Sequence, residues 1–219
     1  MDKVKYEKTK THQTYKTRDG NKVPGVTTVL GIINKPALLA WAWQCGMDGI
    51  DFRKSKDKAA DIGTIAHFLI ECHLKGVEPD TSEFAPADLS RAETAYIKWL
   101  SWWDAGKFTF IASEIQLVSE KHKYGGTLDI VAKDSAGITT LIDLKTGKGI
   151  YDEMWFQVNG AYRQLWDELH PDDEVERVII CRIGKEEQGD FETQERIVAG
   201  RDFEIFIAAL NLYRLLKNK

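Results

Sequence analysis

The chain has 219 residues, of which 43% are hydrophobic and 29% charged, a balance typical of a soluble globular protein. No apolar run reaches the roughly 18 residues of a membrane span, so no membrane contact is expected. The N-terminus lacks an apolar signal region, which favours a cytoplasmic protein. The three cysteines are widely spaced without a Cys-x-x-Cys pair, so neither a zinc knuckle nor an iron–sulfur cluster is expected.

The net charge of −4 argues against a protein that coats nucleic acid indiscriminately. Its distribution is uneven, because residues 1–58 carry a basic excess and residues 59–219 an acidic one. The basic part could bind phosphates while acidic residues hold a metal, but a solvated lysine-rich segment is an equally good interpretation. We expect a single domain over residues 1–219, with 1–58 as an N-terminal elaboration and 59–219 as the core.

The N-terminal part is predicted to contain a small hairpin and two helices. Residues 12–24 form the hairpin. Thr27 or Thr28 then caps a short helix through Ile33, and such a helix end offers N–H groups and a hydroxyl to a phosphate. A plain helix cap explains the same residues equally well. The second helix begins at Lys35, which is followed by proline.

Residues 57–74 are predicted to form a helix that is apolar over much of its circumference and ends at Gly76. His67 lies in the middle of it, and a histidine in such a setting is more often a core residue than a ligand. Glu71 follows one turn later on the same face. A role at a metal and a role at the surface are about equally supported for Glu71.

A helix beginning at Asp88 or Ser90 is predicted to continue to about Gly106, and residues 108–120 form the first long strand. Glu114 interrupts the apolar stretch of that strand. It borders the functional site in one interpretation and is a sheet-edge charge in the other.

Residues 124–147 read as a hairpin of two β-branched, apolar strands around the turn 134–137. A three-residue loop with Gly137 in the left-handed conformation places Asp129 directly opposite Asp143. Lys145, two residues beyond Asp143, points to the same face.

Two carboxylates opposite each other destabilise a sheet unless something offsets their repulsion. A divalent cation does so, because hard oxygen ligands suit Mg²⁺ or Mn²⁺, and the neighbouring lysine could orient a water. A solvated face with unrelated charges is the alternative, which the apolar setting of Asp143 disfavours.

A helix over residues 152–169 follows, then strands over 177–183 and 191–198 that pair as a hairpin. A final amphipathic helix over 202–216 covers the sheet and is expected to carry no chemistry. The element order predicts an α/β fold with a mixed central sheet flanked by helices.

Several motifs carry a family resemblance. Gly126-Thr127-Leu128-Asp129 and Asp143-Leu144-Lys145 resemble the PD-(D/E)XK nuclease superfamily, whose core is restriction-endonuclease-like. Gly63-x-x-x-His67 resembles the motif on the preceding helix of RecB-type nucleases, in which the histidine is a metal ligand. Residues 23–28 with Lys35-Pro36 look like the N-terminal segment of phage and mitochondrial genome-maintenance exonucleases.

RecB-type nucleases also carry Gln-x-x-x-Tyr on the helix after the hairpin. Here Gln157 and Tyr162 are five residues apart, which on a regular helix separates them by about 140° rather than about 40°. Either a local bulge near Gly160 restores the alignment, or only one of the two faces the site. The second interpretation favours Gln157.

The resemblance implies metal-dependent hydrolysis of DNA phosphodiester bonds without sequence specificity, by an exonuclease of phage or bacterial recombination, repair or replication. It also implies a bacterial or phage-infected host cytoplasm and a helicase or recombinase partner. One or two Mg²⁺ or Mn²⁺ ions would be held by His67, Asp129, Asp143 and the Leu144 carbonyl. Lys145 would position the attacking water, with Gln157 and Tyr162 beside it, and DNA would contact Thr27, Thr28, Lys35 and Lys148.

Two other classes of function compete with this one. A non-catalytic nucleic-acid-binding protein with a vestigial site is disfavoured because His67, Asp129, Asp143 and Lys145 are all intact. A sugar- or nucleotide-processing enzyme lacks support because no phosphate-cradling glycine-rich loop follows a strand.

Overall fold

The computed structural model describes residues 3–6, 13–184, 191–197 and 200–217, and of residue 37 and residues 53–61 it describes the backbone only. The elements before the central sheet are β1 (Val4–Lys5), β2 (Tyr15–Lys16), β3 (Lys22–Val23), α1 (Val26–Leu30), α2 (Pro36–Met47), α3 (Phe52–Lys75), β4 (Pro79–Asp80) and α4 (Pro86–Gly106). The remaining elements are β5 (Thr109–Ser119), β6 (Tyr124–Lys133), β7 (Thr139–Lys145), α5 (Asp152–Trp155), the π-helix η1 (Phe156–Tyr162), α6 (Arg163–Leu169), β8 (Arg177–Ile183), β9 (Phe191–Arg196) and α7 (Gly200–Lys217).

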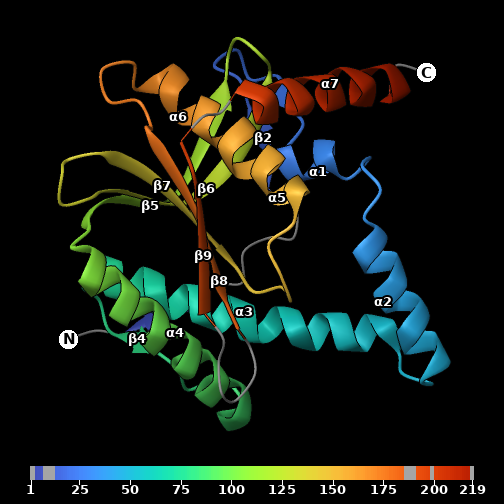
Figure 1. Ribbon diagram of the computed structural model, residues 1–219, viewed down its shortest axis with the longest axis vertical. Coiled ribbons are helices and arrows are strands. Elements are labelled where there is room, and N and C mark those ends of the chain that lie inside the picture. The colour runs from blue at the N-terminus through green and yellow to red at the C-terminus, as the bar shows by residue number, and fades with distance from the viewer. Residues whose placement is uncertain (1–2, 7–12, 185–190, 198–199, 218–219) are drawn as a thin grey trace.

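The centre of the molecule is a five-stranded sheet in the order β5-β6-β7-β8-β9 (Figure 1). Only β7 and β8 pair in parallel, and the other neighbours are antiparallel. Apolar side chains of α3 and α4 pack on one face, and those of α1, η1, α6 and α7 on the other. The predicted α/β fold with a mixed sheet flanked by helices is therefore confirmed. No helix in the described part of the chain is long and apolar enough to cross a membrane.

The β6–β7 hairpin has the predicted register. Gly137 is left-handed, with φ 81°, and the Asp134 N–H donates to the Ile138 carbonyl over 3.1 Å. Ile130 pairs with Ile142 further along the same ladder. Because turn chemistry determines hairpin register, residues 129 and 143 come to adjacent positions on neighbouring strands.

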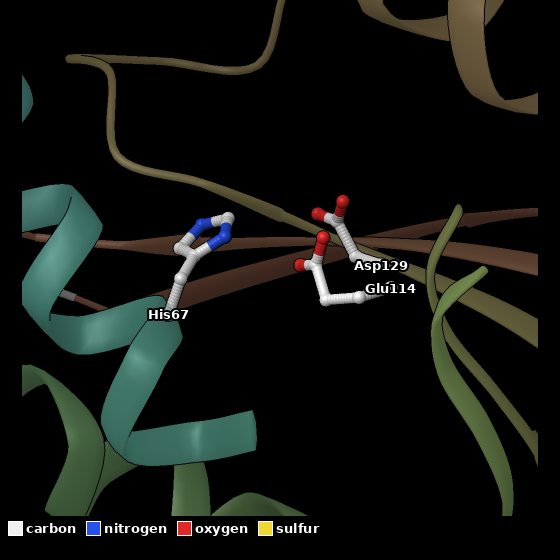
Figure 2. Close-up of side chains that lie close together, drawn as sticks. All are labelled: His67, Glu114 and Asp129. Atoms are coloured by element: carbon white, nitrogen blue, oxygen red, sulfur yellow. The ribbon is translucent and has the colours of Figure 1, made fainter. Parts of the chain in front are cut away.

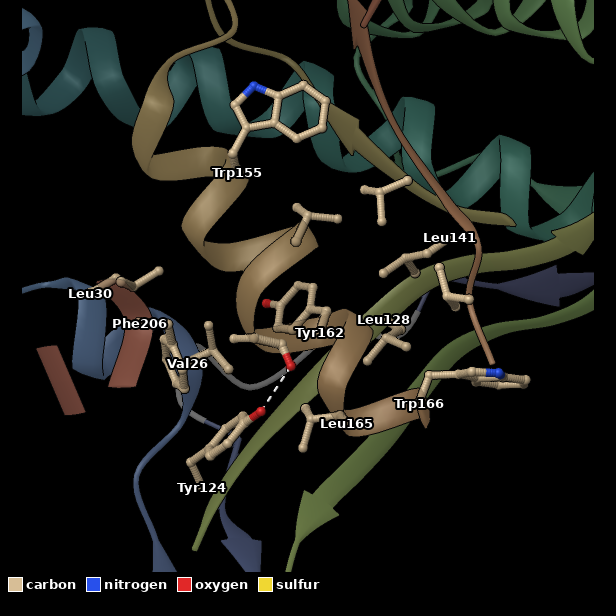
Figure 3. Packing of buried hydrophobic residues seen from close by; sticks show 14 of the residues in the cluster. Val26, Leu30, Tyr124, Leu128, Leu141, Trp155, Tyr162, Leu165, Trp166 and Phe206 are labelled. Carbon is tan, nitrogen blue, oxygen red and sulfur yellow. Dashed lines mark hydrogen bonds between the residues drawn. The ribbon is translucent and has the colours of Figure 1, made fainter. Parts of the chain in front are cut away.

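The face of the sheet under η1 and α6 is closed by large side chains (Figure 3). Tyr124 is fully buried, and its hydroxyl donates to the Ala161 carbonyl over 2.9 Å. A Cβ on Gly126 would lie 2.6 Å from the Tyr162 ring, so only glycine lets this tyrosine lie flat against β6. The packing thus brings the helix after the hairpin close to the strand that carries Asp129.

The predicted hairpin near the N-terminus is confirmed as β2–β3, and it lies against β6. The Gly125 N–H donates to the Pro24 carbonyl over 3.0 Å, and the hydroxyl oxygens of Tyr15 and Thr127 are 2.9 Å apart. A Cβ on Gly125 would lie 2.4 Å from the Tyr15 ring. The N-terminal segment is therefore tied to the strand that carries the candidate site.

Some predicted helix ends are wrong. Gly25, not a threonine, is the N-cap of α1, and both Thr27 and Thr28 lie inside this helix without capping it. This short helix has no side-chain cap. Its apolar residues hold it against the core. The helices α3 and α4 begin earlier than predicted, at Phe52 and Pro86, and α1 ends at Leu30 rather than at Ile33.

Candidate metal centre

An imidazole and two carboxylates meet where α3 crosses the first two strands of the sheet (Figure 2). His67 on α3, Glu114 on β5 and Asp129 on β6 each direct one ligand atom to the same place, and these atoms lie within 4.8 Å of one another. Three separate elements therefore supply one group of nitrogen and oxygen ligands.

His67 reaches the sheet because α3 approaches the end of β7 closely. A Cβ on Gly63 would lie 2.5 Å from Thr146 Oγ1, so a larger residue would push the helix away. Gly63 is one turn before His67 on the same side of the helix. The glycine of the Gly-x-x-x-His motif thus has a packing role, and the helix brings His67 into the group of side chains that could hold a metal.

Glu114 belongs to the group of side chains that could hold a metal, which favours the interpretation that it borders the site. Its backbone is left-handed, with φ 52°, which is costly for a residue with a side chain. Its neighbours Ser113 and Ile115 pair with Ile130 and Leu128, so Glu114 lies across from Asp129. Loss of hydration raises the pKa of Glu114 to about 8, and the Asp129 carboxylate adds to the shift.

Asp129 is held by the neighbouring strand. Its Oδ2 accepts a hydrogen bond of 2.8 Å from the Leu144 N–H. Burial raises the pKa of Asp129, whereas the Lys145 ammonium and the bond from Leu144 oppose the rise. A strand residue directs its N–H and C=O to the same neighbour, so the Leu144 carbonyl also faces β6.

Asp143, the other aspartate expected at the metal, forms an ion pair with a lysine. Its side chain is only 1% exposed, and its Oδ2 forms an ion pair with Lys145 Nζ. The group of mutually close ligand atoms contains Glu114 rather than Asp143. The physical reason is that Lys145, two residues along the same strand face, lies within reach of Asp143 as its counter-charge.

Burial raises the pKa of Asp143 to about 6, although Lys145 offsets part of the rise and Asp129 adds to it. Burial alone would lower the pKa of Lys145, but the two aspartates outweigh it and leave the pKa raised. Lys145 is therefore a cation at neutral pH. Oδ1 of Asp143 is buried and has no hydrogen-bond partner among the described residues.

Gln157 and Tyr162 lie together in the π-helix, where the backbone makes wider turns than in an α-helix. The Gln157 amide donates to the Tyr162 hydroxyl over 2.8 Å, so residues five apart share one face. Burial, and next the carboxylates of Asp143 and Asp129, hold the pKa of the Tyr162 phenol well above its usual range. The interpretation with a bulge near Gly160 is the correct one.

A cleft of about 890 Å³ opens in front of the three ligands. It is lined by Lys5, Tyr6 and Gln13 from the N-terminal segment, and by Thr64, Glu71 and Lys75 on α3. Glu71 forms an ion pair with Lys75. The sequence interpretation missed Lys5 and Lys75, because nothing local relates either residue to strands that follow tens of residues later.

The four side chains expected to contact DNA do not line this cleft. Thr27 and Thr28 are exposed on α1, and Lys35 is the exposed N-cap of α2. Lys148 is exposed in the loop between β7 and α5. Contact of these residues with DNA stays a prediction.

No protein-family model matches the chain, and no curated protein matches it either. Among solved structures, the crystal structure of SSO0001 aligns with 62% of this chain and 63% of its own, at 16% identity and a TM-score of 0.39. A protein named "Putative exonuclease" from Eubacterium rectale aligns with 73% of this chain and 66% of its own, at 12% identity and a TM-score of 0.43. The chain thus matches less than two thirds of either protein. At these TM-scores neither likeness bears on the chemistry of the site.

Proposed function

We propose that the protein is a metal-dependent deoxyribonuclease with a PD-(D/E)XK site, acting as an exonuclease. The observation that carries the proposal is the meeting of His67, Glu114 and Asp129 beside the buried Asp143–Lys145 pair. The motif resemblance described above supports the same class of enzyme. Neither a phosphate-cradling loop nor a base-reading motif competes with it in the sequence.

The residues present fit a divalent cation. One imidazole nitrogen and several carboxylate oxygens are a donor set that suits Mg²⁺ or Mn²⁺. Burial is the main cause of the raised pKa values of Glu114 and Asp143, and a bound cation would favour the charged forms of both carboxylates. Oδ1 of Asp143 is a further buried oxygen, and no described residue donates a hydrogen bond to it.

His67, Glu114 and Asp129 would hold the ion, with Asp143 and the Leu144 carbonyl completing its surroundings or holding a second one. A bound divalent cation makes a phosphodiester more electrophilic and a water more acidic.

The remaining chemistry belongs to the chain's own groups. Lys145 Nζ donates hydrogen bonds that orient the attacking water and stabilise the negative charge that develops on the phosphate oxygens. Asp143 keeps the lysine charged and directed into the site. Tyr162, whose phenol feels the charges of Asp143 and Asp129, and its partner Gln157 would support this arrangement.

DNA is the proposed substrate because the cleft has room for a chain of phosphates and carries Lys5 and Lys75 on its rim. The pairing of Lys75 with Glu71 leaves the region near the ligands only weakly basic. We therefore expect modest, salt-sensitive binding without sequence preference. A helicase or recombinase partner and a bacterial or phage-infected cytoplasm rest on the motif resemblance alone.

The experiment is cleavage of DNA labelled at either end, single- or double-stranded, with Mg²⁺, Mn²⁺ or a chelator. We expect cleavage with either metal, none with the chelator, and none by Asp129→Asn. Glu195→Gln is the matched control, since it makes the same chemical change on an exposed residue of β9 outside the cleft. Binding of DNA without cleavage by wild type at any metal concentration would overturn the proposal and favour a vestigial site.

A further inference from the structure

The segment that carries Gln157 and Tyr162 is an unusual one. The turns of a π-helix are wider than those of an α-helix, and its hydrogen bonds are less favourable. A π-helix is therefore rare without support from its surroundings. In this protein it spans Phe156–Tyr162 between two α-helical pieces. Its effect is to align residues 157 and 162, which join through the 2.8 Å hydrogen bond. Whatever stabilises the π-helix therefore also determines where these two side chains point.

The support comes from the first turn of the C-terminal helix α7. The fully buried Asn159 donates from Nδ2 to Asp202 Oδ2 over 2.7 Å. Asp202 is itself 4% exposed. The contact joins the middle of the π-helix to residues more than forty positions later, so it is set by the tertiary fold and not by local sequence.

Two further contacts make this junction rigid. A Cβ on Gly160 would lie 2.5 Å from the Asp202 carbonyl oxygen, so the backbone of α7 presses directly on the π-helix. Arg196 Nη1 donates to both Asp202 oxygens, at 2.8 and 2.9 Å, and its guanidinium lies 4.4 Å from the centre of the Trp155 ring. The carboxylate of Asp202 is therefore fixed from both sides.

We propose that Asp202 is a positioning residue for the nuclease site: through Asn159 it holds the π-helix so that Gln157 stays bonded to Tyr162, whose phenol lies near Asp143 and Asp129. The proposal deepens the nuclease function and rests on it for its activity readout. It gives α7 a role that the sequence did not indicate, since this helix was expected only to cover the sheet. The competing explanation is that Asp202 merely neutralises Arg196.

The test compares Asp202→Ala with Arg214→Ala. Arg214 is also on α7, but its Nη2 donates to the His122 carbonyl over 2.5 Å, so its loss loosens α7 without touching the π-helix. Hydrogen exchange of the backbone amides in residues 156–162 is measured in both variants. Cleavage is measured well below each melting temperature, with kcat and KM determined separately.

We expect faster exchange of residues 156–162 in Asp202→Ala than in Arg214→Ala. We also expect a fall in kcat on the order of 10- to 100-fold, with KM changed little, because small displacements of supporting groups cost that much. In a Gln157→Ala background the further loss from Asp202→Ala should largely vanish, since residues acting through one another are not additive. Asp202→Asn, which keeps an acceptor for Asn159, should recover part of the activity.

Equal exchange of residues 156–162 in the two variants would overturn the positioning role, and so would additive losses with Gln157→Ala. The exchange measurement needs no activity, so the support of the π-helix by Asp202 is tested even if wild type proves inactive on DNA. If wild type is inactive but residues 156–162 exchange faster in Asp202→Ala than in Arg214→Ala, the nuclease function is rejected. The support of the π-helix by Asp202 is then retained. Normal cleavage by Asp202→Ala with a lowered melting temperature alone would assign Asp202 to stability.

Discussion

The carboxylate of Asp129 on β6 accepts a hydrogen bond of 2.8 Å from the backbone N–H of Leu144 on β7. The bond lies where the ladder between these strands ends, so a side chain takes the place of a backbone acceptor. It fixes the orientation of Asp129 toward His67 and Glu114 and ties it to the strand of Asp143 and Lys145. Asp129 and the Asp143–Lys145 pair are thus held together by one short piece of the sheet.

Loss of Lys145 should remove cleavage. Lys145→Ala takes away the charge that orients the water, which typically costs ~10²–10³-fold or more in kcat. It also leaves the buried Asp143 without its partner, so a loss of stability of up to about 3–5 kcal/mol is expected without metal. Lys133→Ala is the control, because Lys133 is on the same hairpin and pairs with Asp173 at the surface.

The double variant Asp143→Asn/Lys145→Met separates chemistry from folding. Replacing both members of a buried pair is often nearly neutral for stability. Thermal melting should therefore approach that of wild type while cleavage stays absent, and a gel shift in Ca²⁺ should still detect DNA binding. Measurable cleavage by this double variant would reject the role given to Lys145.

His67 is expected to bind metal as the neutral imidazole. Apparent Mn²⁺ affinity should fall as pH drops through the range in which an unperturbed histidine titrates, about 6.5, because protons compete with the metal for the imidazole nitrogen. His67→Ala should weaken Mn²⁺ binding by at least about tenfold in isothermal titration and reduce that pH dependence. The control is His73→Ala on the same helix, where the imidazole contacts the Tyr96 hydroxyl instead. Unchanged affinity in His67→Ala with a lowered melting temperature would make it a core residue.

Glu114 should make the metal-free protein less stable as pH rises. Its pKa is about 8 in the folded protein against an ordinary 4.5, so between these values the folded state binds more protons than the unfolded state. Unfolding free energy then falls with increasing pH across that window. Asp143, whose pKa is raised to about 6, also lowers stability with rising pH, but only up to about pH 6.

The measurement is thermal melting in chelator at about pH 6 and about pH 8. Wild type should lose more stability than Glu114→Gln, and Mn²⁺ should restore wild type selectively. The open cleft admits water to Glu114, so the difference will be smaller than full burial would give. Identical pH profiles of the two proteins would place Glu114 outside the ligand set.

Gly63→Ala tests the close approach of α3 to β7. Alanine is better than glycine inside a helix by about 1 kcal/mol, but the added Cβ would lie 2.5 Å from Thr146 Oγ1, and overpacking costs about 1–3 kcal/mol. We expect net destabilisation and weaker Mn²⁺ binding, since His67 moves with the helix. In a Thr146→Ala background the same change should become neutral or stabilising. Destabilisation of similar size in both backgrounds would show that Thr146 is not the obstacle.

The parts of this site that could be predicted are those determined over short distances along the chain. The register of Asp129 against Asp143 follows from a turn of a few residues, and the position of Lys145 follows from the period of a strand. The ligand group itself was only partly predicted. The left-handed backbone of Glu114 has no signature in its neighbours, and the partner of Asp143 depends on which charge lies nearest in space.

From the sequence alone, two interpretations of Gln157 and Tyr162 remained open: a bulge that aligns them, or only one of them facing the site. The π-helix that decides it packs against Asp202, which lies far along the chain. The threonine caps of α1 failed because packing of the helix, and not its hydrogen-bonding end, determines where it begins. Local rules therefore predict strand pairing here, whereas contacts between distant segments complete the site.

The parallel pairing of β7 with β8 imposes an order on folding. The β6–β7 hairpin is local and can form early, but β8 can join only after residues 146–176 have folded back across the sheet. Until then β7 is an exposed edge, and unprotected edges invite pairing with other chains. Asp143 and Lys145 put two charges into that otherwise apolar edge. The residues proposed for cleavage would therefore also discourage aggregation while the chain is still folding.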